Sequence, residues 1–250
     1  MNAQRIEGTV ALVTGANRGI GRALTEALLT RGARKVYATA RNPEALSALQ
    51  DERVVALRLD VTDVDQVRSA GEAASDVQLV FNNAGVALAT GIADSIDQAR
   101  REMEVNYFGP LQLLQRLAPT LARNGGGAVV NIGSAAGLTN LPFVPTYSAS
   151  KAALHSLTQA ARVLLQAQGT SVFGVYPGPV DTDMSRDVAM AKTSPRDVAF
   201  AVLDGIEAGR EDIFPDAYAV EFGQQFESSP KASERQMAAI TAAMLSGATA

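Results

Sequence analysis

Short runs of apolar residues, rich in β-branched side chains, alternate along the chain with longer segments of helical periodicity. The runs are nearly continuous rather than alternating, which is typical of parallel strands buried on both faces between two layers of helices. The strand-then-helix order predicts right-handed crossovers and an α/β, doubly wound parallel sheet. The expected strands occupy residues 9–15, 35–40, 54–59, 77–83, 127–134, 171–178 and a short seventh run at 212–216.

Two of the helical segments are long, at about 94–123 and 147–168. No linker rich in proline or serine divides the chain and no repeat period is present, so residues 1–250 are expected to form one domain. The stretch from about 217 to 250 is polar and rich in alanine. It is either a terminal helix that packs on a partner or a frayed tail.

Composition narrows the possible functions. The net charge is −4 and the charges are interspersed, which argues against a nucleic-acid surface or a polybasic membrane patch. Charged stretches such as QARREMEVN are expected to be mainly solvated helix faces. The chain has no cysteine and one histidine, His155, which argues against a metal site or a Ser-His-Asp triad. His155 is expected to pack on its helix.

No segment has the apolar length of a signal peptide or of a membrane-spanning helix, so a cytoplasmic protein is expected.

The segment TGANRGIG (residues 14–21) directly follows the first expected strand and opens a helix. Gly15, Gly19 and Gly21 let the backbone approach a pyrophosphate at a helix N-terminus, where unpaired N–H groups and the helix dipole favour anions. This strand-turn-helix context is the one that a dinucleotide-binding loop requires. The spacing is Gly-x3-Gly-x-Gly rather than the general Gly-x-Gly-x-x-Gly, and a plain structural turn is the alternative.

Five motifs occur together and in order: TGANRGIG, NNAG at 82–85, Ser134, YSASK at 147–151 and YPGPVDT at 176–182. In this the chain resembles the short-chain dehydrogenase/reductase family over most of its length, and the resemblance thins after about residue 217. It implies a seven-stranded Rossmann-type fold, a nicotinamide cofactor and hydride transfer to a carbonyl. It leaves the substrate open.

The residues after the second expected strand favour NADP(H) over NAD(H). NAD-preferring members of the family usually carry an acidic residue at position 40, where this chain has Ala40 followed by Arg41. A guanidinium binds a 2′-phosphate in a forked, charge-assisted manner, and Arg18 in the glycine loop is a second candidate. The alternative is that both arginines are solvated surface charges.

The resemblance implies further cofactor contacts. Asp60 and the backbone of Val61 are expected at the adenine, unless Asp60 caps the next helix, a role open to Thr62 or Asp63 as well. Asn83 is expected to tie neighbouring strands together in addition. The expected cofactor-binding residues are Gly15, Asn17, Arg18, Gly19, Ile20, Gly21, Arg41, Asp60, Val61, Asn83, Ala84, Gly85, Tyr147, Lys151, Pro177, Gly178, Val180 and Thr182.

Tyr147 and Lys151 are four residues apart near the start of a helix, so their side chains share a face. A nearby ammonium and the positive nicotinamide ring are expected to lower the tyrosine pKa from about 10. Tyr147 would then act as general acid in reduction and general base in oxidation, with Lys151 also bonding the nicotinamide ribose. Ser134, at the carboxyl end of the fifth strand, would hold the substrate oxygen. Without Ser134, a structural pair would be the better interpretation.

Asn106 lies inside the long helix, four residues before Pro110, which has no N–H. The carbonyl of residue 106 therefore loses its usual donor, the helix is expected to kink, and the carbonyl is free to hold a water. In the family the matching asparagine supports a water that connects to the active-site lysine. The alternative for Asn106 is that the kink serves packing alone. The expected catalytic set is Asn106, Ser134, Tyr147 and Lys151.

The segment that usually covers the substrate is short, because Ser194 is expected to cap the next helix and Pro195 to open it. An open, permissive pocket for bulky aryl or alkyl ketones is predicted. The expected substrate contacts are Ser134, Leu141, Phe143, Val144, Tyr147 and Met184.

The sequence thus predicts an NADP(H)-dependent carbonyl reductase or alcohol dehydrogenase that acts on small molecules. By resemblance, the two long helices pair across a two-fold axis in a homodimer or homotetramer. The protein is not expected to bind nucleic acid, a membrane or a metal. Two alternatives stay open. An epimerase or dehydratase on the same scaffold is disfavoured by the complete Asn-Ser-Tyr-Lys set, and a non-enzymatic NADP(H) sensor tends to lose the tyrosine or lysine that this chain keeps.

Overall fold

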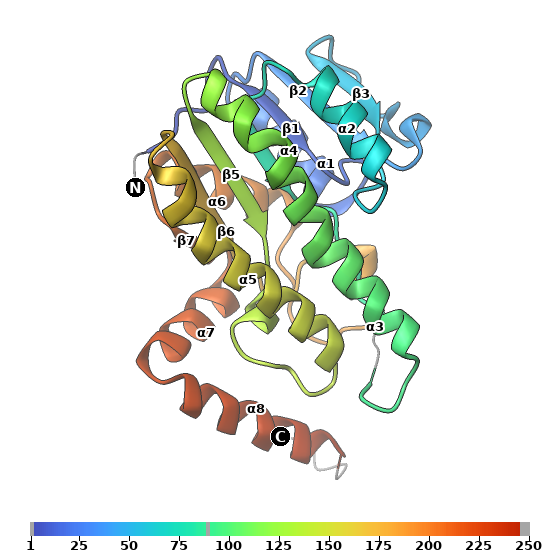
Figure 1. The fold of residues 1–250 in the computed structure, drawn as a ribbon. Helices are drawn as coiled ribbons and strands as arrows, with labels where there is room; N and C mark the ends of the chain where they lie inside the picture. The colour runs from blue at the N-terminus through green and yellow to red at the C-terminus, as the bar shows by residue number, and fades with distance from the viewer. Residues whose placement is uncertain (1–2, 89–90, 246–250) are drawn as a thin grey trace.

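A computed structural model describes residues 3–88 and 91–245 of the protein. Its strands form a seven-stranded sheet in the order β3-β2-β1-β4-β5-β6-β7, and all neighbouring strands are parallel. The strands are β1 (Val10–Val13), β2 (Lys35–Ala40), β3 (Val54–Arg58), β4 (Leu79–Asn82), β5 (Gly127–Ile132), β6 (Thr170–Val175) and β7 (Asp212–Ile213). The strand order reverses at β1, so the predicted doubly wound, Rossmann-type sheet is confirmed (Figure 1).

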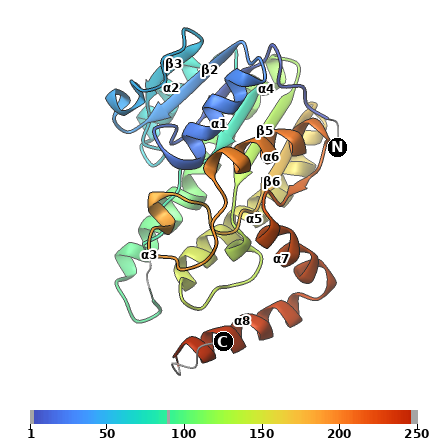
Figure 2. The ribbon, with the colours of Figure 1, turned by 180° about the vertical axis from the view of Figure 1, so that it is seen from behind.

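Helices cover both faces of the sheet. On one face, α1 (Gly19–Thr30) and α6 (Pro195–Glu207) lie side by side, as Figure 2 shows. On the other face are α2 (Val64–Ala73), α4 (Gly109–Arg123) and α5 (Pro145–Gln166). The two-residue period of β1 divides its side chains between two cores: Ala11 and Val13 face α1 and α6, while the residues that alternate with them face the other layer.

The edge strand β3 departs from the expected burial. Val55 is 36% exposed and Ala56 is also exposed, whereas every residue of β1, β4 and β6 is buried. The prediction of strands buried on both faces is therefore wrong for β3. Its apolar run, VVALR, resembles that of an inner strand, but an edge position leaves one side without a neighbouring strand.

The predicted helix at 94–123 is interrupted. It consists of α3 (Ile96–Met103), a π-helical turn at Glu104–Phe108, and α4. In the π turn the Gly109 N–H donates to the carbonyl of Glu104, five residues back. Pro110 follows directly and supplies no N–H, so the disturbance expected from this proline takes the form of a widened helical turn.

The C-terminal segment is helical where the structure describes it, with α7 (Ala217–Ser228) and α8 (Pro230–Leu245). Ala135, Phe222 and Met237 form a small core there, with Leu138 and Leu141 packed against it. The two helices therefore lie against the protein's own loop after β5, below the sheet in Figure 1. Residues 246–250 of the predicted segment 217–250 lie outside the described residues.

Three short 3₁₀ turns complete the described elements: η1 (Pro43–Leu46), η3 (Ala135–Gly137) and η4 (Asp183–Ser185). Within residues 3–88 and 91–245, no helix combines the length and the apolar character needed to cross a bilayer.

Candidate active site

The glycine loop joins β1 to α1 at the carboxyl edge of the sheet. Gly15 and Gly19 have φ angles of +65° and +54°, in the left-handed region that favours glycine. A Cβ on Gly21 would lie 2.2 Å from the Gly15 oxygen and 2.4 Å from Asn83 Nδ2. A side chain at position 21 would therefore fill this cradle. Because glycine leaves the backbone open, the cradle fits a pyrophosphate at the start of α1. Asn17 and Ile20 are partly buried in the same loop.

The NNAG segment at the end of β4 lies between the glycine cradle and α5, the helix that carries Tyr147 and Lys151. The Thr14 hydroxyl accepts from the backbone N–H groups of Asn83 and Ala84 at 2.9 Å each, and Asn83 Nδ2 donates to the Thr14 carbonyl at 2.8 Å. The predicted structural role of Asn83 is thus confirmed. A Cβ on Gly85 would lie 3.2 Å from Asn106 Oδ1 and 3.5 Å from Lys151 Nζ. A glycine at position 85 therefore lets these groups converge.

The two arginines expected at the 2′-phosphate lie at the same edge. Arg18 immediately precedes α1 and forms no side-chain cap; its Nη1 lies 2.8 Å from Asp183 Oδ2. Arg41 follows β2 and is exposed. Both guanidinium groups are accessible from solvent, and Arg18 is held by a carboxylate of the segment after β6.

Asp60 does not cap α2, because Asp63 accepts from the first N–H groups of that helix. Asp60 Oδ1 accepts from Thr62 N at 3.0 Å and Thr62 Oγ1 at 2.7 Å, and Oδ2 lies 3.7 Å from Arg101 Nη2. Burial opposes ionisation, but the Thr62 hydrogen bonds and the nearby arginines outweigh it and hold the pKa of Asp60 below its usual range. Val61 beside it is buried.

The three groups proposed for catalysis converge at this edge. Tyr147 lies in the first turn of α5, and Lys151 Nζ is 5.9 Å from the centre of its ring. Lys151 Nζ also donates to the Ile132 carbonyl at 2.8 Å. Ser134 follows β5, and its hydroxyl is near enough to Tyr147 to lower the pKa of the phenol. The expected Ser-Tyr-Lys geometry is therefore present.

The direction of the Tyr147 pKa differs from the expectation. Burial raises the pKa of Tyr147 to about 12; the Ser134 hydrogen bond opposes this effect and the negative charge of Glu102 adds to it. Burial also lowers the pKa of Lys151 to about 8. Among the protein's own groups, desolvation of this partly buried phenol therefore outweighs the acidification expected from Lys151. Tyr147 is a neutral phenol at neutral pH, the form that donates a proton.

Asn106 acts through its side chain in a way that the sequence did not indicate. It is fully buried; Oδ1 accepts from Val86 N at 2.9 Å, and Nδ2 donates to Val86 O at 2.8 Å and to Ser150 Oγ at 2.9 Å. Ser150 Oγ donates in turn to the Tyr147 carbonyl at 2.7 Å. Asn106 therefore ties the segment after β4 to α5.

The turn after β6 is held from the C-terminal segment. Gly178 N–H donates to Asp216 Oδ2 at 2.9 Å, and the Pro177 carbonyl accepts from Ala135 N at 3.1 Å. Val180 and Thr193 form an isolated β-bridge, which brings together the two ends of the segment 181–192. The methyl group of Thr182 would lie 3.1 Å from a Cβ on Gly19. The turn, the cradle and the C-terminal segment therefore meet.

The expected substrate walls differ in burial. Leu141 and Val144 are partly buried, and Leu141 packs on the small core shared with α7 and α8. Phe143 and Met184 are 48% and 51% exposed. Ser194 caps α6 by accepting from Asp197 N, and Pro195 opens that helix, as predicted.

Sequence reasoning missed Glu102 and Asp216. Glu102 lies in the stretch interpreted as a solvated helix face, yet it is fully buried; its spacing of four residues from Asn106 was the available signal. Asp216 caps α7 as well as holding Gly178, and an aspartate just before a helix indicates a cap. His155 packs as expected, with Nδ1 2.7 Å from Tyr176 Oη.

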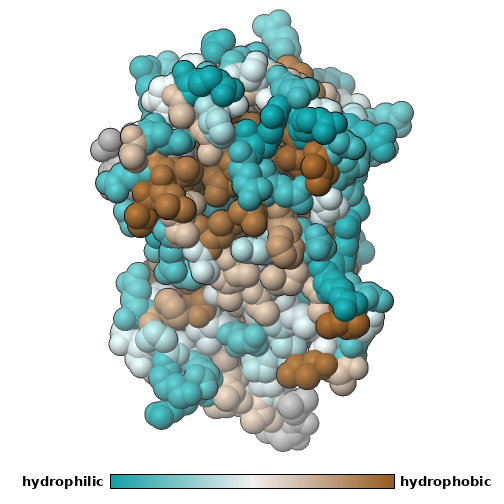
Figure 3. Space-filling view, in the orientation of Figure 1, coloured by the Kyte–Doolittle hydropathy of each residue, from teal (hydrophilic) through white to brown (hydrophobic). Residues whose placement is uncertain are grey.

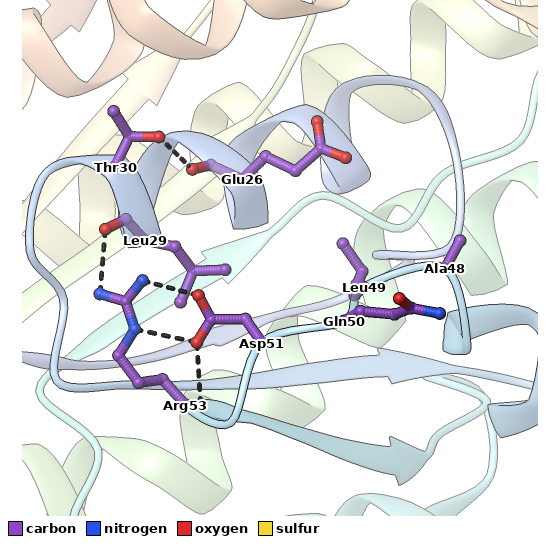
Figure 4. Close-up of a pocket in the computed structure, with 8 residues that line it drawn as sticks. All are labelled: Glu26, Leu29, Thr30, Ala48, Leu49, Gln50, Asp51 and Arg53. Carbon is purple, nitrogen blue, oxygen red and sulfur yellow. Dashed lines mark hydrogen bonds and ion pairs between the residues drawn. The ribbon is translucent and has the colours of Figure 1, made fainter.

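A surface hollow of about 280 Å³ lies elsewhere, between α1 and residues 48–53 (Figure 4). Arg53 there pairs with Asp51 and donates to the Leu29 carbonyl. Arg53 precedes β3 and Thr30 ends α1, so the hollow is at the amino edge of the sheet, opposite the candidate active site.

Comparison with known proteins agrees with this geometry. The family model for short chain dehydrogenase matches residues 9–193. An uncharacterized oxidoreductase of Staphylococcus saprophyticus is 31% identical over 217 residues, which cover 81% of this chain and 92% of the relative. A short chain dehydrogenase from Burkholderia cenocepacia, solved in complex with NADP, is 42% identical with a TM-score of 0.88, covering 93% of this chain and 98% of that one.

A second solved structure carries the other dinucleotide. This short chain dehydrogenase/reductase from Burkholderia phymatum, in complex with NAD, is 26% identical with a TM-score of 0.79, covering 87% of this chain and 92% of that one. The matched family pattern spans most of the chain and includes the glycine cradle, Ser134, Tyr147 and Lys151. The chain is therefore an oxidoreductase of the short-chain dehydrogenase family.

Proposed function

We propose that the protein uses NADP(H) to reduce a ketone or aldehyde to an alcohol, reversibly, with Tyr147 as the general acid and base. The observation that carries the proposal is the convergence of Ser134, Tyr147 and Lys151 beside the glycine cradle. The carboxyl edge of a doubly wound sheet is where such folds bind ligands. The bound nicotinamide supplies the hydride in reduction and accepts it in oxidation.

The chain's own residues handle the proton. Ser134, whose hydroxyl acts on the pKa of Tyr147, holds the carbonyl oxygen of the substrate next to that phenol. Tyr147, neutral at physiological pH, donates its proton to the oxygen as the alcohol forms, and the reverse transfer accompanies oxidation. Lys151 supports the cofactor ribose. The backbone carbonyl of Asn106, four residues before Pro110, holds a water on the path from Lys151 to solvent.

Cofactor preference rests on charge at the end of β2. Ala40 provides no carboxylate to repel a 2′-phosphate, while Arg41 and Arg18 lie on the same edge. The NADP bound to the Burkholderia cenocepacia relative supports NADP(H) as the preferred cofactor. Asp60 and Val61 would meet the adenine. The remaining contacts would come from the backbone of NNAG and from Pro177, Gly178, Val180 and Thr182.

The substrate is expected to be bulky and apolar. Phe143 and Met184 are half exposed, and Val188 and Met190 add exposed apolar surface to the segment after β6. A short covering segment, closed at its base by Val180 and Thr193, leaves room for groups that project outward. Aryl or long alkyl ketones suit such walls better than small keto acids.

A second copy of the chain is the expected partner. Apolar surface gathers over the outer face formed by α4 and α5 in Figure 3. Phe108, Val163 and Leu164 are 40%, 73% and 76% exposed. Burying such side chains against a symmetry-related face would stabilise a homodimer or homotetramer.

The direct test is NADPH consumption, followed by absorbance, across a panel of aryl and alkyl ketones and small keto acids. Tyr147→Phe is expected to lower the rate at least 100-fold, in line with the loss of a general acid, without loss of NADPH binding. The control is Tyr37→Phe, since Tyr37 on β2 donates its hydroxyl hydrogen to Asp76, away from the site. NADPH binding without turnover of any ketone would favour a sensor instead.

A further inference from the structure

Glu102 is a buried carboxylate that the proposed reaction does not use. It lies on α3 with 0% of its surface exposed. Its Oε1 accepts from Leu88 N at 2.8 Å and its Oε2 accepts from Thr146 Oγ1 at 2.6 Å. A charge taken out of water is costly unless such bonds compensate it. Both oxygens are thus held at a junction of three segments: α3, the loop after β4 and the start of α5.

The junction lies next to the proposed proton donor. Thr146 immediately precedes Tyr147 in the first turn of α5. Ser134 after β5 and Glu102 on α3 act on the pKa of Tyr147, and Lys151 Nζ on α5 itself lies 5.9 Å from the centre of its ring. Glu102 is the negative one. The charge of this carboxylate acts on the Tyr147 pKa in the same direction as burial does.

We propose that Glu102 is a positioning residue: its carboxylate, bonded to Leu88 N and Thr146 Oγ1, holds the first turn of α5 and places a negative charge next to the residue that precedes Tyr147. The proposal rests on the function proposed above. It implies that reduction, which needs the phenol, continues further into alkaline pH than it otherwise would. Oxidation, which needs the phenolate, begins to rise only at correspondingly higher pH.

The charge is tested with Glu102→Gln, which keeps the side-chain shape and one oxygen acceptor. Its matched control is Glu104→Gln, which removes the same charge from an exposed position two residues away. We expect the pH midpoint of Tyr147 ionisation to fall by about one pH unit in Glu102→Gln and to stay unchanged in Glu104→Gln. The pH profile of alcohol oxidation should move by the same amount.

The midpoint is measured without turnover by absorbance titration of tyrosinate in the NADP⁺ complex. The chain has five tyrosines and no tryptophan, and subtracting the titration of the Tyr147→Phe protein isolates the Tyr147 signal. This measurement stands even if no alcohol is oxidised, so a failure of the proposed function is distinguishable from a failure of the role of Glu102.

Anchoring is tested separately with Thr146→Val and Glu102→Asp, which both keep the negative charge. We expect each to lower kcat while the midpoint stays at the parent value. An unmoved midpoint in Glu102→Gln, an equal shift in Glu104→Gln, or a shift in Thr146→Val as large as that in Glu102→Gln would each overturn the proposal. If Glu102→Gln does not fold, as judged by thermal denaturation, the decision rests on Glu102→Asp: a shifted midpoint contradicts the proposal, and an unmoved midpoint with reduced kcat supports it.

Discussion

Arg18 and Asp183 form an ion pair that joins the glycine loop to the segment after β6, with Nη1 and Oδ2 2.8 Å apart. One residue precedes the first helix and the other belongs to the segment after β6. Asp183 is also bonded by Arg186, and the two arginines together lower the pKa of Asp183. A 2′-phosphate would therefore compete with Asp183 for the guanidinium of Arg18.

Replacing Asp183 by asparagine should tighten NADPH binding. The change removes the competing charge, and we expect the Kd for NADPH to fall roughly two- to fivefold, the range of an exposed ion pair, with little change for NADH. Fluorescence titration with both dinucleotides measures the effect. Asp187→Asn, a neighbouring acidic residue of the same segment, is the control. An equal gain for NADH would show that Asp183 acts on access to the cleft rather than on the phosphate.

The residue that ends β2 should decide cofactor preference. Ala40 is 4% exposed, and Ala40→Asp would place a carboxylate where it repels a 2′-phosphate and accepts from ribose hydroxyls. We expect the ratio of kcat/KM for NADPH over NADH to fall at least tenfold, which corresponds to about 1.4 kcal/mol. Arg41→Ala should lower the same ratio less. An unchanged ratio in both variants would place phosphate recognition elsewhere.

Lys151→Met should raise stability while abolishing activity. Burial lowers the Lys151 pKa from 10.5 to about 8, so below pH 8 the buried ammonium destabilises the fold by about 3 kcal/mol. This cost is fully present below the folded-state pKa and disappears as the pH rises toward 10.5. Because the hydrogen bond to Ile132 is also lost, we expect a net gain of about 1–3 kcal/mol at pH 7.

The comparison is made by urea denaturation of parent and Lys151→Met at pH 7 and pH 10, with the sign of the pH effect as the criterion. The difference in unfolding free energy should shrink at the higher pH. A difference that grows with pH would contradict the assignment of Lys151 as a buried ammonium.

Asp216→Ala should lower both stability and turnover. Asp216 caps α7 and also accepts from Gly178 N in the turn after β6. Loss of the cap and of one buried hydrogen bond should cost about 1–3 kcal/mol and loosen the turn against the nicotinamide, which lowers kcat. Asp63→Ala removes a cap from α2 instead and should lower stability alone. Equal kcat in the two variants would argue that Asp216 is only a helix cap.

The sheet could be predicted because its strands are short apolar runs and the carboxyl ends of parallel strands share one edge. That edge also placed the glycine loop, Ser134 and the start of α5 together. The exposure of Val55 could not be predicted, because a run of apolar residues does not say which strand will be its neighbour. Edge and inner strands have the same local pattern when both are apolar.

The sequence indicated that the candidate residues lie together at one edge of the sheet, but it did not indicate their electrostatics. Spacing places Tyr147 and Lys151 on one helix face, yet the sign of the tyrosine pKa depends on burial, which is a property of the whole fold. Glu102 was missed for the same reason: its carboxylate is partnered by a backbone N–H near position 88 and a hydroxyl at 146. The spacing of four residues places Glu102 on the helix face of the buried Asn106, but its two partners are too distant in sequence to add a local pattern.

Leu141 borders the proposed substrate cleft, yet the small core that supports it includes Phe222 and Met237. Both of these lie beyond residue 193, where the family match ends. The proposed acid–base residues and the support of the proposed substrate wall therefore occupy separable parts of the polypeptide. Mutational drift in the last two helices can reshape what fits the pocket and leave the chemistry intact, which offers a route by which one reaction diversifies across many substrates.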